Sequence, residues 1–176
     1  MTIVVCPLSH VETVVRARAP SHMITLLDPS HELETPKGLQ GRHLRVGVND
    51  ICEPTEGLIL ADVAMVERLV EFGREWPGAA PLLVHCWAGI SRSTATAFIL
   101  ACERNPEVEE ARIARTLREA SPTALPNRHF VALADDILGR RGRMVDAIAA
   151  IGPGQFYMEG QPFDLPIRYD REGGGR

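Results

Sequence analysis

The sequence predicts an α/β fold in which a central, mostly parallel sheet of about four to five strands is flanked by helices. Three observations support this fold class. Short runs of β-branched and apolar residues alternate along the chain with longer segments whose apolar residues recur at helical spacing. Proline and glycine residues separate most of these segments. The 176 residues suffice for one domain with a substantial core.

The expected strands are four apolar, β-branched runs that are bounded by turn-forming or charged residues. They comprise residues 2–6, 23–27, 43–48 and 82–84. In an open parallel sheet, ligands bind at the edge where the carboxyl ends of the strands meet. Residues 85 and 86 directly follow the last run, so we expect them at this ligand-binding edge.

The expected helices carry apolar residues on one face and are mostly closed by proline or glycine. They comprise residues 10–18, 56–76, 93–104, 107–120, 127–140 and 144–151. The helix over residues 56–76 is the longest, and Pro77 and Gly78 end it. The segment from 28 to 41 contains proline, glycine and several charges, which indicates a surface loop.

Residues 1–151 are expected to form a single domain, with residues 152–176 as an extended tail. The tail contains Pro153, Pro162 and Pro166, and glycines occupy positions 173–175 near its end. Proline and glycine disfavour regular elements, so the tail should pack on the domain along part of its length and fray at its end.

The composition is that of an ordinary globular protein, with 45% hydrophobic and 24% charged residues. A net charge of −4 and a pI of about 5.9 give no overall attraction to nucleic acid or to an anionic membrane. No segment approaches the roughly 20 apolar residues that span a bilayer, and the first residues lack the basic start of a signal peptide. We therefore expect a cytoplasmic protein without nucleic-acid or membrane partners, of unknown oligomeric state.

The four cysteines, Cys6, Cys52, Cys86 and Cys102, are scattered and have no paired metal-binding spacing. In a reducing compartment they are expected to be free thiols. Cys6, Cys52 and Cys102 are expected to be small buried apolar residues, because unpaired cysteines are often buried. An alternative for Cys52 is a disulfide with an oxidised Cys86, which would protect that sulfur from further oxidation. Neither a metal nor another cofactor is expected.

The stretch PLLVHCWAGISRST, residues 81–94, has an order of groups that suits the binding of a phosphate. A loop that leads from a strand into a helix N-terminus can turn several backbone N–H groups toward an anion, and the helix dipole favours the anion there. Gly89 supplies backbone freedom, and the planar guanidinium of Arg92 can hold two phosphate oxygens. Cys86 opens the loop, where the same donors favour a thiolate, so a bound phosphoryl group would face a sulfur nucleophile.

The segment HCWAGISRS, residues 85–93, resembles the signature loop of the cysteine-dependent protein tyrosine phosphatases, in which five residues separate Cys from Arg. The flanking His, the Gly, the following Ser and the strand-loop-helix context agree with that family. In size the chain is similar to the dual-specificity-like, bacterial-type members. The resemblance implies a phosphatase-like catalytic domain that hydrolyses phosphotyrosine, with phosphoserine and phosphothreonine as further candidate substrates. A phosphorylated protein or peptide is the implied partner.

The resemblance also implies a role for each residue of this loop. Cys86 is the nucleophile and Arg92 the phosphate clamp. Ser93 is implied to hydrogen-bond the thiolate and to assist the breakdown of a cysteinyl-phosphate, although it could instead, or also, cap the next helix. The residues implied to bind the substrate phosphate, largely through backbone amides, are Trp87, Ala88, Gly89, Ile90, Ser91 and Arg92.

Two residues outside the anion site are implied to support it. The ring of His85 is implied to hydrogen-bond the backbone and to tune Cys86, and simple packing is its alternative role. Asn127 belongs to a Pro-Asn pair that resembles the one ahead of the family's last core helix, where it would cap that helix or brace the loop. Trp87 could wall the pocket or point into the core.

The general acid is assigned by its place in the chain. In the small family members an aspartate lies in a loop after the strand that precedes the long helix. Asp50 follows the third expected strand and lies 36 residues before Cys86. Its alternative role is an Asx turn that only shapes the bend. Asp62 is nearer in sequence but falls inside the expected helix, where solvated surface is its expected role, and Glu53 and Glu56 are the remaining candidates.

Other functions are weighed against the phosphatase. A phosphate-binding module that has lost turnover would follow if Asp50 is not the acid. A sulfur-transfer or arsenate-reducing enzyme also uses a cysteine in an anion-binding loop, but it accounts less well for Gly89 together with Arg92 and Ser93. Inositol phospholipids are disfavoured as substrates, because the variable positions of the signature loop carry no positive charge.

Overall fold

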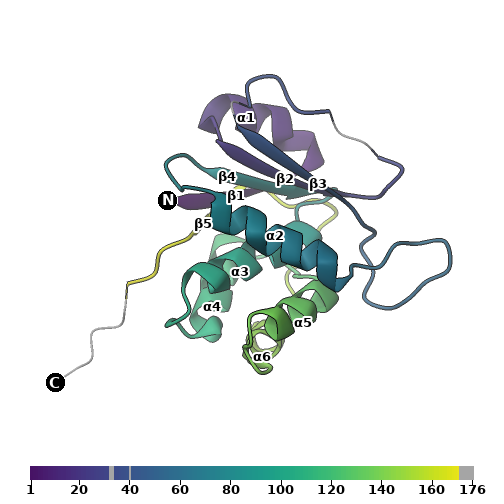
Figure 1. Ribbon diagram of the computed structural model, residues 1–176, viewed down its shortest axis with the longest axis vertical. Helices are drawn as coiled ribbons and strands as arrows, with labels where there is room; N and C mark the ends of the chain where they lie inside the picture. The colour runs from purple at the N-terminus through teal and green to yellow at the C-terminus, as the bar shows by residue number, and fades with distance from the viewer. Residues whose placement is uncertain (32–33, 40, 171–176) are drawn as a thin grey trace.

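The computed structural model describes residues 1–31, 34–39 and 41–170, which build a five-stranded sheet with helices on both faces (Figure 1). The strand order is β3-β2-β4-β1-β5. The strands are β1 (Thr2–Pro7), β2 (His22–Leu27), β3 (Arg42–Gly47), β4 (Leu82–Cys86) and β5 (Phe163–Pro166). The first four strands are parallel, and β5 pairs antiparallel with β1. This confirms the predicted fold class.

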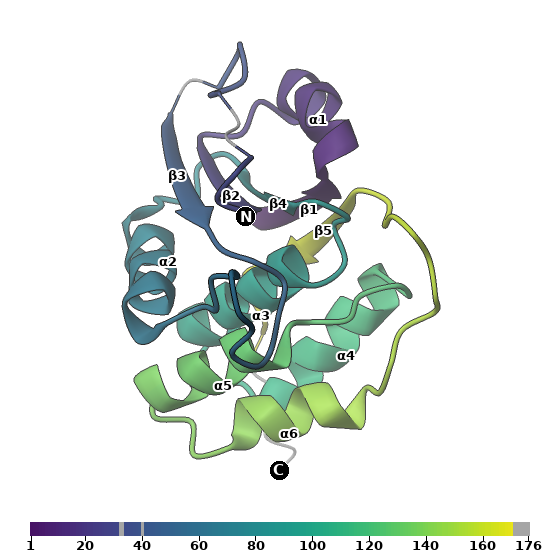
Figure 2. The same ribbon diagram turned by 90° about the vertical axis from the view of Figure 1, so that its right-hand side faces the viewer.

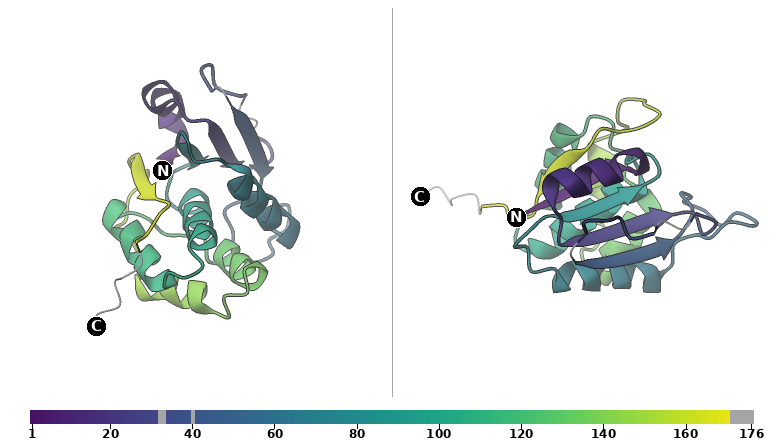
Figure 3. Two further views of the ribbon diagram at one scale, coloured as in Figure 1. Left: turned by 60° about the vertical axis from the view of Figure 1, so that its left-hand side comes forward. Right: turned by 90° about the horizontal axis from the view of Figure 1, so that it is seen from above.

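One helix covers one face of the sheet, and the remaining helices of the described residues cover the other (Figures 1 and 3). The single helix is α1 (Val11–Arg18), which follows the short 3-10 helix η1 (Leu8–His10). The others are α2 (Val63–Glu75), α3 (Arg92–Arg104), α4 (Glu110–Ala120), α5 (Arg128–Ile137) and α6 (Arg143–Ala150). Each expected helix is present, and apart from α2 its ends lie within three residues of the prediction.

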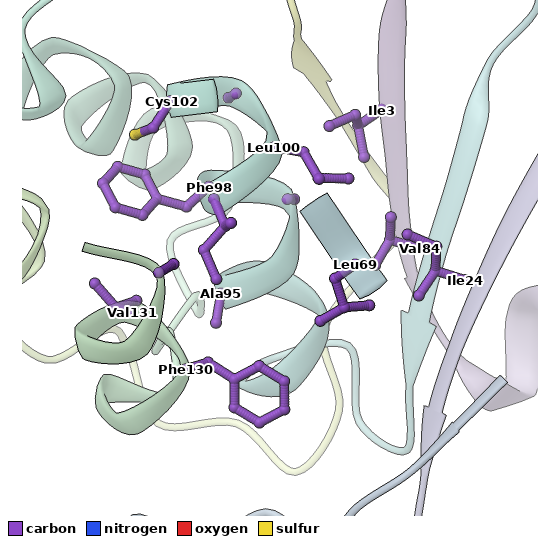
Figure 4. Close-up of a cluster of buried hydrophobic side chains, with 14 of the residues drawn as sticks. Ile3, Ile24, Leu69, Val84, Ala95, Phe98, Leu100, Cys102, Phe130 and Val131 are labelled. Carbon is purple, nitrogen blue, oxygen red and sulfur yellow. The ribbon is translucent and has the colours of Figure 1, made fainter. Parts of the chain in front are cut away.

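Helix α3 is the central helix of the larger core. Its residues are buried from Arg92 to Cys102. Figure 4 shows Phe98 of this helix among side chains from α5, and Leu100 near Ile3 of the sheet. Fully burying a side chain of this size stabilises the fold by about 1.5–3 kcal/mol. Because α3 is fixed by packing on all sides, the position of the loop that leads into it is fixed as well.

Helix α2 begins at Val63, whereas the sequence predicted a start at residue 56. Asp62 is its N-cap, and its Oδ1 accepts a hydrogen bond from the backbone N of Met65 at 2.8 Å. A short carboxylate satisfies N–H groups that have no partner at a helix start, which favours Asp at this position. Gly57 has a φ of +75°, a left-handed conformation that a helix does not contain. Asp62 is therefore a helix cap, not the solvated surface of a helix.

Strand β5 was not predicted. It has four residues, includes Pro166 and follows Pro162, so its local sequence is typical of a loop. Pairing with β1 forms the strand and places the buried Leu165 opposite Ile3. The C-terminal segment is thus bound to the sheet at least as far as residue 166. The predicted frayed end, residues 171–176, lies outside the described residues.

The loops after β2, β3 and β4 leave the same end of the sheet, as parallel strands require (Figure 2). They comprise residues 28–41, 48–62 and 87–91. The segment between α6 and β5 also reaches this end, where the backbone N of Gly160 donates to the carbonyl of Ala88 at 2.8 Å. Four segments that are distant in the sequence therefore meet where the sequence predicted a site.

Candidate active site

The thiol of Cys86 lies at the carboxyl end of β4, beside the first turn of α3. Its Sγ is 3.1 Å from Oγ of Ser93. Cys86 is 2% exposed, and it lies on the wall of a pocket at the sheet edge. Ser93 is not the cap of α3, because the helix begins at Arg92 after the N-cap residue Ser91. The Ser93 hydroxyl is therefore available to the sulfur.

The loop that contains Cys86 and Arg92, residues 86–92, is called the signature loop below. It depends on glycine at position 89, where φ is +68°. A Cβ atom there would lie 2.7 Å from the backbone N of Pro7 and 2.9 Å from the carbonyl carbon of Cys6. Both obstacles are backbone atoms, so no side chain can rotate away to make room. The turn thus packs directly against the end of β1, which fixes its distance from the sheet.

The outward-facing carbonyls of the signature loop accept hydrogen bonds from three separate segments. Leu8 N donates to the carbonyl of Trp87 at 3.1 Å, Gly160 N to that of Ala88 at 2.8 Å, and Leu125 N to that of Ile90 at 2.9 Å. The backbone N–H groups of residues 88–91 have no hydrogen-bond acceptor among the described residues. Uncommitted N–H groups just before a helix N-terminus form a site that favours an anion.

Arg92 is 4% exposed and holds two loops together. Its Nη1 donates to Oδ1 of Asp28 at 2.8 Å and to the backbone carbonyl of Val48 at 2.7 Å. Its buried Nε has no partner among the described residues. Because an arginine has five N–H donors in a fixed plane, anchoring one nitrogen orients the rest. Asp28 and Val48 thus orient the guanidinium, and Nε stays available to a ligand.

Asp50, in the loop between β3 and α2 (residues 48–62, the β3–α2 loop), is tied to the signature loop and to α5. Its Oδ1 accepts from Oγ of Ser91 at 2.7 Å and from Nδ2 of Asn127 at 2.8 Å. Its Oδ2 has no partner among the described residues. Asn127 also caps α5, with its Oδ1 accepting from the backbone N of His129 and of Phe130. One amide side chain therefore joins the start of α5 to Asp50.

These groups surround a pocket of about 410 Å³. It is lined by Asp28, His31, Asn49, Asp50, Ile51, Leu58, Cys86, Trp87, Ala88 and Arg92. Trp87 is 49% exposed, and the ring of His31 meets it edge-on with 4.8 Å between the ring centroids. Trp87 thus forms a wall of the pocket and does not point into the core. Arg92 is the one lining residue with a permanent positive charge among the described residues.

His85 lies beneath the signature loop and is fully buried. Its Nε2 lies 2.7 Å from the hydroxyl of Thr25 on β2, a side-chain partner that the resemblance did not imply. Its buried Nδ1 makes no hydrogen bond of good geometry among the described residues. Burial lowers the pKa of His85 to about 4, although the Cys86 backbone favours a proton on the ring. The imidazole is therefore neutral at physiological pH.

The structure brings most of the predicted site residues to one pocket. Cys86, Arg92 and Asp50 line it, Ser93 contacts the sulfur, and Asn127 contacts Asp50. Trp87 and Ala88 also line the pocket. Residues 89–91 complete the loop, and His85 lies below it.

Five residues of the pocket lining were not predicted, and the alternative acid candidates lie outside the pocket; the unpredicted residues are Asp28, His31, Asn49, Ile51 and Leu58. Of these residues, Asp28 had a signal in the sequence that could have indicated a site residue. It directly follows the buried strand β2, at the edge of the sheet where ligands bind. Glu53 and Glu56 are exposed and do not line the pocket.

Cys52 corrects another expectation, because it is exposed and not buried. Its Sγ lies 3.7 Å from Oδ1 of Asn127. Cys6 and Cys102 are buried, as expected. Burial raises the pKa of the Cys6 thiol to about 12, which keeps it protonated at physiological pH.

Within residues 1–31, 34–39 and 41–170, no group of three or more His, Cys, Asp or Glu side chains is arranged to hold a metal ion. In the same residues, no helix is long and apolar enough to cross a bilayer.

Comparisons with known proteins point to one fold. No protein-family model matches the sequence, and no curated protein matches it either. DUSP15 is similar in structure, with a TM-score of 0.57 and 18% identity over 87% of this chain and 91% of that chain. A mouse putative dual specificity phosphatase complexed with zinc tungstate has a TM-score of 0.52 and 22% identity, over 78% and 79% of the two chains. PTPMT1 in complex with PI(5)P has a TM-score of 0.57 and 14% identity, over 84% and 90%.

Proposed function

We propose that this chain, which has the fold of the dual-specificity phosphatases, is a protein phosphatase that hydrolyses phosphotyrosine through a cysteinyl-phosphate. One observation carries the proposal. A buried thiol in contact with a serine hydroxyl lies in a loop whose N–H groups at residues 88–91, together with Nε of Arg92, are uncommitted. Such donors stabilise a phosphate dianion and the charge that develops during its transfer.

In the first step, the thiolate of Cys86 attacks phosphorus, so that an S–P bond forms and the ester O–P bond breaks. The leaving oxygen takes its proton from Oδ2 of Asp50, the carboxyl oxygen without a partner among the described residues. Arg92 and the loop amides hold the three equatorial oxygens of the phosphoryl group.

In the second step, water attacks the cysteinyl-phosphate. The carboxylate of Asp50 takes a proton from the water, an O–P bond forms, and the S–P bond breaks to release inorganic phosphate. The hydroxyl of Ser93, 3.1 Å from Sγ, donates to the departing thiolate and stabilises its charge. Each residue thus returns to its starting state after one turnover.

The lining of the pocket favours a single phosphate on a protein side chain. Ile51, Leu58 and Trp87 give it apolar walls that suit an aromatic ring. Asp28 and Asp50 add two carboxylates to the lining of the pocket, which opposes a ligand with several phosphates. A phosphotyrosine peptide therefore fits better than a polyphosphorylated inositol head group. Serine and threonine phosphates enter the same pocket with fewer apolar contacts.

The direct test is turnover of p-nitrophenyl phosphate in the presence of EDTA. The wild-type protein should release phosphate, and Cys86→Ser should reduce the rate at least about a thousandfold, because a hydroxyl is a far weaker nucleophile than a thiolate. Cys102→Ser is the matched control, since Cys102 is a second buried cysteine on the far part of α3. Turnover that survives in Cys86→Ser contradicts the proposal.

A phosphopeptide panel separates the candidate substrates. Phosphotyrosine peptides should have the highest kcat/KM, phosphoserine and phosphothreonine peptides a lower value, and phosphatidylinositol phosphates the lowest. If Cys86→Ser binds a phosphotyrosine peptide and the wild-type protein does not hydrolyse it, the chain is a binding module of this fold. Preferred turnover of the lipid contradicts the assignment of a protein substrate.

A further inference from the structure

A chain of hydrogen bonds crosses the sheet from its surface to the strand that carries Cys86. Nη2 of Arg45 donates to Oγ1 of Thr35 at 2.7 Å, and this hydroxyl lies 3.0 Å from Nδ1 of His43. Nε2 of His43 lies 2.7 Å from Oγ1 of Thr25. The same Thr25 oxygen lies 2.7 Å from Nε2 of His85. The chain thus passes from β3 through β2 to β4.

The two imidazoles are neutral in the folded protein, so each carries one ring proton. Burial lowers the pKa of His43 to about 4, and the charge of Arg45 contributes to this. The pKa of His85 is lowered to about 4 for the same main reason. The Thr25 hydroxyl has a single proton and is 3% exposed. It can therefore donate to one imidazole while it accepts from the other.

The outer end of the chain sets its direction. Because the Thr35 oxygen accepts from Arg45, its own proton is available to Nδ1 of His43. His43 then carries its proton on Nε2 and donates to Thr25, and Thr25 donates to Nε2 of His85. His85 is left with its proton on Nδ1. In this direction, the hydroxyls of Thr35 and Thr25 both donate to an imidazole of the chain of described residues. In the reverse direction, His43 would donate to Thr35, and the Thr35 hydroxyl proton would have no acceptor within the chain.

The inner end of the chain lies on the residue that precedes the nucleophile in strand β4. The Nδ1 atom of His85 is buried, makes no hydrogen bond of good geometry among the described residues, and belongs to the residue that precedes Cys86. The Cys86 backbone favours a proton on this ring. Every donor in the chain then points toward the strand that carries Cys86. The aligned dipoles place the positive end of the chain on the residue before Cys86, where it can act on the reactivity of the sulfur.

We propose that Thr25 and His43 are positioning residues, which hold His85 in its Nδ1–H form and thereby raise the reactivity of Cys86. The proposal rests on the proposed function only in that Cys86 is the nucleophile. Other groups also face this sulfur. They are Ser93 and Arg92 from α3, Asp28 after β2, Asp50 after β3, and Cys6 from β1. None of these residues is altered by the substitutions below.

Thr25→Val and Thr25→Ser form a matched pair. Valine keeps the shape of threonine but lacks the hydroxyl, whereas serine keeps the hydroxyl and loses a methyl group. Alkylation of Cys86 by iodoacetamide is followed as a function of pH, with mass spectrometry to identify the modified cysteine. At pH 6, Thr25→Val should react about threefold to tenfold more slowly than wild type, the effect of one lost hydrogen bond. Thr25→Ser should react within about twofold of wild type.

The tautomers are read directly from long-range ¹H–¹⁵N spectra of the histidine side chains. The wild-type protein should show His85 protonated on Nδ1 and His43 protonated on Nε2. Thr35→Val changes an exposed side chain, so folding is preserved, and it should make the His43 tautomers mixed. Thr116→Val is the control, because it removes a hydroxyl on α4 that donates to the carbonyl of Arg112 and takes no part in this chain of hydrogen bonds. It should leave the spectra and the alkylation profile unchanged.

Three results would overturn the proposal. One is a wild-type spectrum with His85 protonated on Nε2. Another is a folded Thr25→Val with the wild-type alkylation profile, and the third is equal slowing in Thr25→Val and Thr25→Ser, which would indicate packing alone. Neither measurement needs phosphatase turnover. Failure of the proposed function therefore appears in the p-nitrophenyl phosphate assay, and failure of this inference appears in the spectra and the alkylation rates.

Discussion

The signature loop and the β3–α2 loop meet at one pocket, but the protein holds them differently. In the signature loop, Cys86 is 2% and Arg92 is 4% exposed, and three segments donate to the loop's carbonyls. In the β3–α2 loop, residues 52–59 are all exposed. That loop is closed mainly by two hydrogen bonds between its own residues. The backbone N of Asn49 donates to the carbonyl of Ile59 at 2.9 Å, and the backbone N of Ile59 donates to Oδ1 of Asn49 at 2.8 Å. Asn127 ties it to the helices.

Under the proposed function, this difference separates phosphate binding by the signature loop from proton transfer by Asp50. The phosphate-binding half of the site is fixed by packing, and a local opening there would disrupt the core around α3. The half that carries Asp50 depends on a few hydrogen bonds, each with a net value of about 0.5–1.5 kcal/mol. Substitutions in the first half should therefore remove activity, whereas those in the second should reduce and shift it.

The largest expected effect is that of Arg92→Lys. A lysine lacks the planar fork that reaches both the phosphate and the Asp28 and Val48 anchors, so kcat/KM should fall about a thousandfold. Steady-state kinetics with p-nitrophenyl phosphate measures this. Arg104→Lys is the matched control, since Arg104 also donates to backbone carbonyls, of Gly73 and Trp76, far from the pocket. A control that loses as much activity as Arg92→Lys would contradict the assigned clamp.

The stability of the protein should depend on pH through His85, which is buried beside the signature loop. The pKa of His85 is lowered from 6.5 to about 4 in the folded protein, so the unfolded chain binds more protons between these values. The contribution of the neutral His85 to the free energy of unfolding is fully present above pH 6.5. It is lost as the pH falls toward 4, and the loss is about 3 kcal/mol. Urea unfolding across this range measures the loss. His85→Gln should lack this contribution, and an equal pH dependence in both proteins would contradict the prediction.

Breaking the contact between Asn127 and Asp50 in the β3–α2 loop should have a smaller effect. Asn127→Asp keeps an acceptor that caps α5 but removes the donor to Asp50, so kcat should fall about tenfold with little change in stability. Asn127→Ala should also lose about 1 kcal/mol of stability with the cap. Kinetics and chemical denaturation of the two variants separate these roles. Wild-type kcat in Asn127→Asp would show that the Asp50 contact is not needed for turnover.

The smallest effect is expected at the exposed acids of the same loop. Glu53→Gln and Glu56→Gln should change kcat by less than about twofold, because surface substitutions away from a site are worth about 0.5 kcal/mol or less. The rate and its pH profile with p-nitrophenyl phosphate are the measurement. A tenfold loss in either variant would move the general acid away from Asp50.

The same contrast explains what could be predicted from the sequence. The signature loop lies within one strand-loop-helix unit, so its spacing in the sequence fixed which of its residues share a site. Asp28 depends on β2 lying beside β4, a long-range pairing that no local pattern encodes. Strand β5 was missed for the same reason, since four residues with a proline become a strand only against β1. The start of α2 was predicted too early, because apolar residues at helical spacing also occur before Asp62. The preference of Asp62 for the N-cap position outweighed this pattern, and the helix begins at Val63.

The pairing of β1 with β5 has a consequence for synthesis on the ribosome. Among the strands, β1 is translated first and β5 last, so the outer side of β1 lacks its neighbour until residue 166 has emerged. Until then, a nascent chain that already contains Cys86 exposes an open strand edge, the kind of surface through which chains aggregate. A chain terminated before residue 163 would keep that edge, so intact translation of these few residues protects the whole sheet.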